Sequence, residues 1–323
     1  MAAYVLRRIG QALLVMLVMS LLVFAGVYAI GNPLAILIPP DATQSDAARL
    51  AASLGLDRPL WQQYFAFLRQ AALGNLGTSF AFNIPAIGLI LERLPATLEL
   101  AATASVIALA LGIPLGLWAG LKPGSTAGRA ITAGSILGFS LPTFWVGLLF
   151  VVGFSVLLGW LPAGGRGPTR EIFGVAVSFL SVEGLKHLVL PAVNLALFKL
   201  ALIIRLTRAG TREALAQDYV RFARSKGLDE RRVIGVHVLK NILIPVVTVA
   251  GLEFGSLIAF AVVTETLFAW PGMGKLLIDS INTLDRPVIV AYLCVTVLMF
   301  VLINLVVDLA HAALDPRVRR DVR

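Results

Sequence analysis

Residues 288–310 read VIVAYLCVTVLMFVLINLVVDLA and contain a single charged side chain, that of Asp308. A helix needs about 20 predominantly apolar residues to cross the hydrocarbon core of a bilayer. The stretch is therefore predicted to be a membrane-spanning helix. Five similar apolar stretches precede it in the chain, at about residues 9–30, 96–121, 131–158, 188–206 and 242–268.

The composition of the whole chain indicates the same class of protein. Of its 323 residues, 58% are hydrophobic and 14% are charged, and the mean hydropathy is +0.88. A soluble domain carries about 25% charged residues and could not bury this much apolar surface in one core. We therefore predict an all-α integral membrane protein with six transmembrane helices. The composition excludes a disordered protein and an ordinary soluble enzyme, and the single cysteine, Cys294, excludes a disulfide within the chain.

The positions of Lys and Arg predict the orientation. Short cytoplasmic loops of membrane proteins carry an excess of these residues. With six spans, sixteen Lys and Arg residues lie on the side of the N-terminus and nine on the other side. Both termini are therefore expected in the cytoplasm. The net charge of +9 reflects this topology, and we expect no binding of nucleic acid.

The predicted spans divide the chain into four parts. They are an N-terminal tail with the first helix (1–30), a small external subdomain (31–95), a transmembrane core (96–310) and a cytoplasmic tail (311–323). The external segment is too long for a plain connector. Residues 46–54 and 59–73 within it have the pattern of short amphipathic helices that rest on the membrane surface.

The internal loop at residues 209–241 has the pattern of two short helices joined by a glycine. Apolar residues recur in it at the spacing of one helical face. They are Leu215, Tyr219, Phe222 and Ala223. Gly227 is placed to end the first helix, and Asp229 and Glu230 to begin the second, where the helix dipole favours acidic side chains. Arg and Lys rim this loop, so it is either a solvated loop or a docking element for another protein.

The chain lacks the common motifs of catalysis. Gly272–Lys275 resembles a phosphate-binding loop only in part, because Leu276 stands where Ser or Thr is required. Ser140 and Ser155 lack the glycine that a nucleophile elbow needs two residues later. The three histidines lie too far apart in sequence for metal-ligand spacing. We expect no catalytic residue, metal or cofactor in this chain.

Ten sequence blocks resemble, in order, those of one family of bacterial transport proteins. They are LGLDRP (54–59), GNLGTS (74–79), RLPATLEL (93–100), PTFWVG (142–147), LGWLPA (158–163), HLVLPA (187–192), QDYVRFARSKGL (217–228), NILIPVVT (241–248), ETLFAWPG (265–272) and DPR (315–317). Each block alone is weak. Together they make the chain similar to inner-membrane permeases of ABC importers, and more narrowly to the B-type permease of the dipeptide, oligopeptide and nickel family. The resemblance runs from about Tyr4 to Arg319.

The resemblance implies a function and a set of partners. A permease of this kind is a multi-pass, non-enzymatic subunit of the bacterial inner membrane that pairs with a second, homologous permease. Two cytoplasmic ATPases, which bind ATP and Mg²⁺, would dock inside, and an external solute-binding protein would deliver the solute. The two permeases would form the pathway for small peptides or a related solute. Dipeptides, oligopeptides, a nickel chelate and glutathione all stay open as that solute.

The resemblance also assigns the internal loop to coupling with an ATPase. The matching residues are Asp218, Tyr219, Arg221, Ala223, Arg224, Lys226, Gly227 and Leu228. A rigid-body tilt of this loop would transmit the closure of the ATPases. The general importer motif begins Glu-Ala-Ala, and here Arg221 stands in place of the Glu. The contact made by that Glu is therefore not transferred to this chain.

Two charged residues lie deep in predicted helices. Lys199 and Glu253 are each about 16 Å from a span end, in a core about 30 Å thick. We expect them to pair or to line the translocation pathway, because each alone would cost several kcal/mol. A purely structural ion pair and a snorkelling Lys199 are the alternatives. Glu99, Glu265 and Asp308 lie nearer the span ends and are expected to make helix-end or inter-subunit contacts.

Two functions of other classes stay open. One is a proton-coupled secondary transporter in which Glu253 and Lys199 relay the proton. Such carriers often contain internal repeats, and no internal repeat is visible here. The other is a membrane scaffold or sensor that transports nothing.

Overall fold

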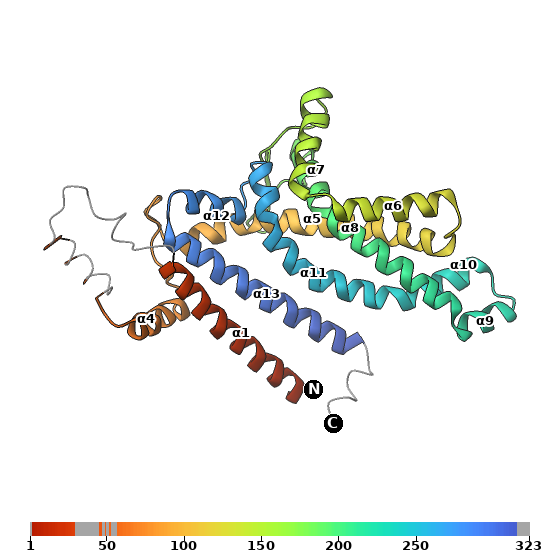
Figure 1. Ribbon diagram of the computed structural model, residues 1–323, viewed down its shortest axis with the longest axis horizontal. Coiled ribbons are helices and arrows are strands. Elements are labelled where there is room, and N and C mark those ends of the chain that lie inside the picture. Colours follow the sequence, from red (N-terminus) through yellow and green to blue (C-terminus); the bar gives the residue numbers. More distant parts are fainter. Residues whose placement is uncertain (1, 30–44, 47–48, 50–51, 53–56, 315–323) are drawn as a thin grey trace.

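The computed structural model describes residues 2–29, 45–46, 49, 52 and 57–314, and nearly all of its regular structure is helical (Figure 1). The helices are α1 (Ala2–Ala29), α4 (Leu60–Ala72), α5 (Ala86–Leu121), α6 (Thr126–Ser140), α7 (Thr143–Phe150), the π-helix η1 (Val151–Leu157), α8 (Val182–Ala216), α9 (Asp218–Ser225), α10 (Glu230–Arg232), the π-helix η2 (Val233–Val238), α11 (Leu239–Leu267), α12 (Met273–Asn282) and α13 (Arg286–Leu314). Two short antiparallel strands, β1 (Arg170–Ile172) and β2 (Val175–Val177), form a hairpin.

The prediction of six spans agrees with the helices, with one difference in shape. In the described part of the chain, five helices are long and apolar enough to cross a membrane, and a bent pair makes up to six. The pair consists of residues 126–140 and 143–157, and its axes differ by 106°. The prediction of one continuous helix over residues 131–158 is therefore wrong.

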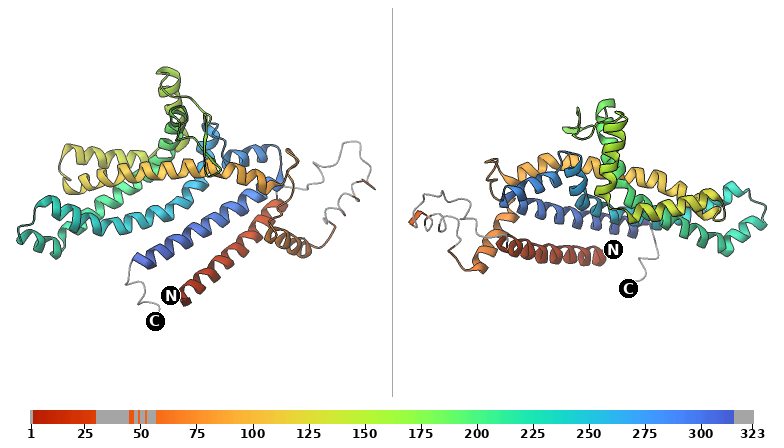
Figure 2. Two further views of the ribbon diagram at one scale, coloured as in Figure 1. Left: turned by 180° about the vertical axis from the view of Figure 1, so that it is seen from behind. Right: turned by 45° about the horizontal axis from the view of Figure 1, so that its top comes forward.

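Pro142 explains the bend. A residue that precedes proline is pushed out of the helical region of φ/ψ space. Leu141 accordingly has an extended backbone, with ψ 135°, and α7 begins directly after Pro142. In Figures 1 and 2 α6 lies along α5 and α8, whereas α7 and η1 turn away from the long helices. The apolar composition of the stretch predicted a helix but not this change of direction.

Helices α5 and α8 pack against each other through three glycines of α5 spaced four residues apart. Gly112, Gly116 and Gly120 of α5 lie against Ile203, Thr207 and Thr211 of α8. A Cβ atom on Gly116 would lie 2.6 Å from Cβ of Thr207 and 2.7 Å from the carbonyl oxygen of Ile204. Small residues at this spacing allow two membrane helices to approach closely.

The helix that carries the second predicted span begins ten residues before that span. Helix α5 starts at Ala86 and continues through Pro95 into the apolar run, so the end of the predicted external segment is helical. Proline is tolerated inside membrane helices when neighbours satisfy the freed backbone groups. The helix is therefore about three turns longer at its N-terminal end than the predicted span.

The first helix lies at one side of the molecule, beside α13 and α4 (Figure 1). Phe24 of α1 contacts the rings of Tyr64 and Phe67 on α4, with centroid distances of 5.3 and 6.0 Å. Helix α4 confirms the second predicted amphipathic helix, at residues 59–73. The other predicted helix, at residues 46–54, lies mostly outside the described residues, as do residues 315–323 of the tail.

Candidate functional site

The predicted coupling loop folds as a short helix set apart from α8. Gln217 has an extended backbone, with ψ 148°, and separates α8 from α9. The expected helix end at Gly227 and the expected helix start at Asp229 are confirmed. Asp229 caps α10, since its carboxylate accepts a hydrogen bond of 3.2 Å from the backbone N–H of Arg231.

Gly227 ends α9 in a Schellman motif. Its φ is +75°, a left-handed conformation that favours glycine. The N–H of Gly227 donates to the carbonyl of Arg224 at 2.9 Å, and the N–H of Leu228 donates to that of Ala223 at 3.4 Å. This pair of bonds defines the motif. The Leu228 side chain packs against the cluster that contains Ala223, which completes the cap.

The buried face of α9 differs from the predicted one. Val220 and Ala223 pack against Val233 and Val238 of η2 and against Ile242 of α11. The sequence predicted a single apolar face from residue 215 to residue 223. The break at residue 217 rotates α9 relative to α8, so that the predicted face is divided between two helices.

Two aromatic side chains of α9 consequently lie on the surface. Phe222 is 60% exposed and Tyr219 is 39% exposed. Nζ of Lys226 lies 4.5 Å from the centre of the Phe222 ring. The loop thus presents aromatic groups outward while its aliphatic residues hold it to the helices behind.

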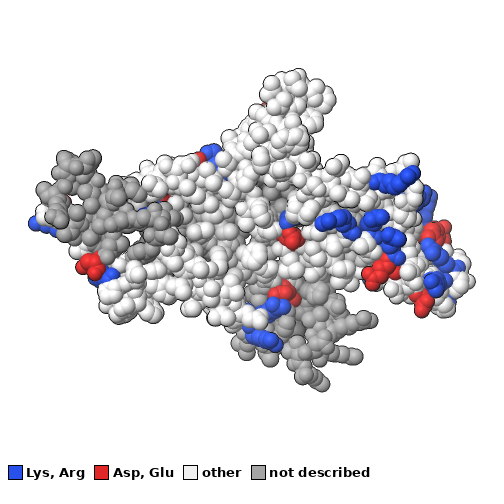
Figure 3. All heavy atoms as spheres, viewed as in Figure 1, with Lys and Arg blue, Asp and Glu red and all other residues white. Residues whose placement is uncertain are grey.

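Charged side chains surround these aromatic groups. Arg224 makes two hydrogen bonds to the Glu230 carboxylate, of 3.1 and 2.5 Å, which join α9 to α10. The hydrogen bonds to Glu230 raise the pKa of Arg224 above its ordinary value. Arg221 lies 3.9 Å from Asp218, and both are well exposed. Figure 3 shows Lys, Arg and acidic side chains gathered at the end of the molecule that carries α9 and α10.

The two deep charges, Lys199 and Glu253, are brought together by α8 and α11. Nζ of Lys199 donates to Oε2 of Glu253 and, at 2.6 Å, to Oγ of Ser256. Both residues lie near the middle of their helices. The structure therefore places them as a pair at one depth.

Comparison with known proteins gives the family. The sequence model of one protein family, the N-terminal part of binding-protein-dependent transport system membrane components, matches residues 1–101. A second family model, that of the binding-protein-dependent transport system inner membrane component, matches residues 112–320. The chain belongs to this permease family.

The similarity to several named relatives covers nearly the full length of the permease. It is 37% identical to the dipeptide transport system permease protein DppB of Escherichia coli K12, over 99% of both chains. It is 38% identical to the di/tripeptide transport system permease protein DppB of Pseudomonas aeruginosa, over 99% of both chains. It is 37% identical to the oligopeptide transport system permease protein AppB of Bacillus subtilis, over 98% of this chain and 99% of that one.

A solved structure shares the fold. The permease resembles a chain of the inward-facing MetNI methionine ABC transporter with a TM-score of 0.55 and 16% identity, covering 70% of this chain and 96% of the other. The family decides between the functions that the sequence left open. The protein is a membrane-embedded ABC importer permease, and the proton-coupled carrier is not supported.

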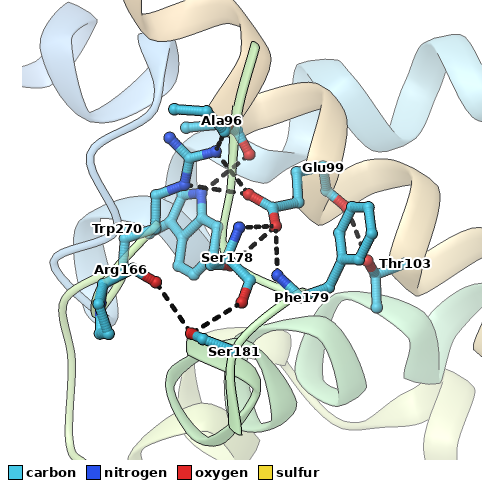
Figure 4. Close-up of polar contacts among 10 residues, drawn as sticks. Ala96, Glu99, Thr103, Arg166, Ser178, Phe179, Ser181 and Trp270 are labelled. Atoms are coloured by element: carbon cyan, nitrogen blue, oxygen red, sulfur yellow. Dashed lines mark hydrogen bonds and ion pairs between the residues drawn. The ribbon is translucent and has the colours of Figure 1, made fainter. Parts of the chain in front are cut away.

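At the other end of the permease, a buried carboxylate holds the β-hairpin segment on α5 (Figure 4). Oε2 of Glu99 accepts hydrogen bonds of 3.0 and 2.6 Å from Arg166. Oε1 accepts bonds of 2.6 and 2.8 Å from the backbone and hydroxyl of Ser178 and one of 3.1 Å from the N–H of Phe179. Arg166 also donates to the carbonyl of Ala176, at 2.5 Å.

A second carboxylate at this end, that of Glu265, holds the segment that follows α11. It accepts hydrogen bonds from Oγ1 of Thr97, at 2.6 Å, and from the backbone N–H of Lys275, at 3.0 Å. Trp270 of this segment donates from its ring to the carbonyl of Ala96, at 2.9 Å. Glu265 is fully buried.

A third carboxylate, that of Asp285, binds the segment before α5. It accepts a hydrogen bond from the Ser79 hydroxyl and bonds of 3.2 Å from the N–H groups of Phe80 and Ala81. Sequence reasoning did not single out Ser79 or Asp285. The signal that could have found Ser79 is the block GNLGTS, in which two glycines with positive φ, Gly74 and Gly77, closely precede it.

The expected end-of-helix contacts are thus contacts within this chain. Glu99 and Glu265 bind their own loops, and Asp308 of α13 pairs with Arg8 of α1 at 3.0 Å. These acidic residues hold loops and helices of the permease together.

Proposed function

We propose that this permease forms, with a second homologous permease, the membrane pathway for small peptides or a related solute. An external binding protein delivers the solute, and two cytoplasmic ATPases, which hold ATP and Mg²⁺, power the transport. Support comes from relatives that are named as dipeptide, di/tripeptide and oligopeptide permeases and match over nearly the full chain. No catalytic role falls to this chain under the proposal.

We further propose that α9 is the element that docks into an ATPase. The observation that carries this is the exposure of Phe222 and Tyr219 on a helix whose other face is fixed to η2 and α11. Aromatic side chains that are exposed on a supported surface are typical anchors of protein interfaces. A loop that served only to carry positive charge would not need them.

The eight residues assigned to the loop would then divide into two groups by role. Ala223, Gly227 and Leu228 hold α9 in its orientation. The outward contacts come from Asp218, Tyr219, Arg221 and Lys226, with Phe222 added by the structure. Arg224 belongs to the supporting group because its guanidinium is bound to Glu230.

The orientation follows from the distribution of charge. The end with α9 and α10 carries many of the Lys and Arg residues, which favours the cytoplasm under the positive-inside rule. The three buried carboxylates and the β-hairpin then lie on the external side, where the binding protein would dock. The N-terminal end of α1 and the C-terminal end of α13 then lie on the cytoplasmic side.

Co-purification tests the proposal. The tagged permease, expressed with its operon partners and extracted in mild detergent, should bring down a second permease and ATPases that hydrolyse ATP. Phe222→Ser should reduce ATPase recovery about tenfold, as expected when an interface anchor is lost. Val236→Ser is the matched control, because Val236 is similarly exposed on the adjacent η2 but lies outside α9.

Recovery of the permease alone from wild-type cells would contradict the proposal. Equal loss in both variants would show a general effect on folding and would also count against a specific role of α9. A normal ATPase yield with Phe222→Ser would move the docking surface away from this helix.

A further inference from the structure

The ion pair of Lys199 and Glu253 is unequal in exposure. The side chain of Lys199 is 8% exposed and that of Glu253 is 36% exposed. The ammonium is enclosed between α8 and α11, where it also binds Ser256 and lies 5.3 Å from the centre of the Phe198 ring. The carboxylate therefore reaches the surface of the chain, whereas its partner does not.

One oxygen of this carboxylate is free to bind something else. Oε2 of Glu253 receives Lys199 and lies 2.9 Å from Oγ of Ser256. Across the residues that the structure describes, no hydrogen bond reaches Oε1. A small hollow between α5, α8 and α11 adjoins the pair, and Ser105 of α5 contributes to its wall.

The depth of Glu253 in the membrane limits the surroundings that its exposed carboxylate can have. Glu253 lies near the middle of α11, far from both ends of the span. An ionised group that faces hydrocarbon at this depth is costly, and such residues face the interior of a bundle or a water-filled cavity. In a permease that shares a pathway with a second subunit, the aqueous surface at this depth is the pathway.

We infer that Glu253 is an anionic binding point on the translocation pathway for the ammonium group of the passing solute, and that Lys199 occupies the carboxylate when no solute is present. The inference rests on the proposed function, because it requires a pathway for an amino-terminated solute. Nζ of Lys199 and the amino terminus of a peptide are both primary ammonium groups. Oε1 offers the first contact, and the solute can then take over the charge-assisted hydrogen bond that Lys199 makes.

Thiol labelling tests the position of Glu253. The complete transporter, with Cys294→Ala removing the natural thiol, is reconstituted with Glu253→Cys or with Leu14→Cys. Leu14 lies near the middle of α1, is well exposed and serves as the control at similar depth. A water-soluble methanethiosulfonate should modify position 253 at least about tenfold faster than position 14, since only the former borders water. Equal rates would overturn the inference.

Peptide uptake tests whether the Glu253 carboxylate binds the ammonium group of the solute. Alanyl-alanine, delivered by the binding protein, is followed as uptake per ATP hydrolysed in proteoliposomes. Glu253→Gln should lower this ratio about tenfold through loss of a charge-assisted contact, while the loaded binding protein still stimulates ATP hydrolysis. Glu253→Asp, which keeps the charge, should retain most of the uptake. An unchanged ratio for Glu253→Gln would overturn the inference.

The labelling and uptake experiments distinguish a failure of this inference from a failure of the proposed function. If the unmodified transporter shows no stimulation of ATP hydrolysis by the loaded binding protein, the proposed function fails. The labelling experiment requires no transport, so it still decides whether Glu253 borders water. A structural ion pair would give slow labelling at position 253 and an unchanged ratio of uptake to ATP.

Discussion

Phe222 and Lys226 lie together on the outer side of α9, with Nζ of Lys226 4.5 Å from the centre of the Phe222 ring. Cation–π contacts of this kind contribute about 0.5–1 kcal/mol at exposed sites. The contact orders Lys226 over a ring that is itself 60% exposed. A surface with a fixed aromatic group and fixed charge loses less conformational entropy on binding than a mobile loop would.

The cap at Gly227 should control the stability of α9. A Cβ atom at this position meets nothing within 4 Å, so the constraint is conformational and not one of space. Gly227→Val should destabilise the loop by about 1–2 kcal/mol because of its φ of +75°. Gly227→Asn should cost less, since Asn tolerates left-handed φ.

Limited trypsin digestion at Arg224 and Lys226 measures this effect. Cleavage should be faster in Gly227→Val than in the wild type, with Gly227→Asn between the two. Gly235→Ala is the control, because Gly235 lies in the helical segment η2 and also has open space around it. Equal cleavage of Gly227→Val and Gly235→Ala would show that the left-handed cap is not what holds α9.

The glycine contact between α5 and α8 should contribute strongly to the stability of the permease. Gly116→Val would add three carbon atoms, of which the Cβ alone would lie 2.6 Å from Cβ of Thr207 and 2.7 Å from a backbone oxygen. Overpacking of this kind costs about 1–3 kcal/mol or more. The melting temperature in detergent should fall by several degrees.

Gly138→Ala serves as the comparison for this contact, because a Cβ atom there meets nothing within 4 Å. Its melting temperature should stay close to that of the wild type. A Gly116→Val permease that melts at the wild-type temperature would show that α5 and α8 do not approach as closely as described.

Removing one partner of the buried pair of Glu99 and Arg166 should lower the stability more than removing one partner of an exposed pair. Their side chains are 2% and 12% exposed, so removing one partner leaves an uncompensated buried charge. Glu99→Gln should cost about 3–5 kcal/mol. Glu183→Gln, which removes the exposed pair with Lys186, should cost at most about 1 kcal/mol.

Thermal unfolding in detergent compares the two substitutions. Glu99→Gln should also expose the hairpin segment to proteases, because Glu99 binds Ser178 and Phe179 at its base. Similar melting temperatures for Glu99→Gln and Glu183→Gln would mean that the hairpin segment is held by other contacts.

Apolar runs predicted the spans well, because the requirement for about 20 apolar residues is local in sequence. The bend after Leu141 and the break at Gln217 were not predicted. Each depends on the backbone of one residue inside an otherwise helical pattern. Matched depth led to Lys199 and Glu253, since depth can be counted along a helix.

The partners of the buried carboxylates Glu99, Glu265 and Asp285 could not be predicted in the same way. Glu99 stood out as a charge at a span end, but its partners Arg166 and Ser178 lie 67 and 79 residues away in the chain. Nothing local links such residues. Periodicity predicted a helix in the loop that contains α9, but which of its side chains face outward depended on how α9 rotates relative to α8.

Photo-crosslinking from position 222 tests the central claim most directly. A photoreactive amino acid replaces Phe222 in the complete transporter, and Val156 of η1, which is also well exposed, is replaced in a parallel sample. Position 222 should give an adduct with the ATPase subunit, and position 156 should give none. An ATPase adduct from position 156 but not from position 222 would contradict the account.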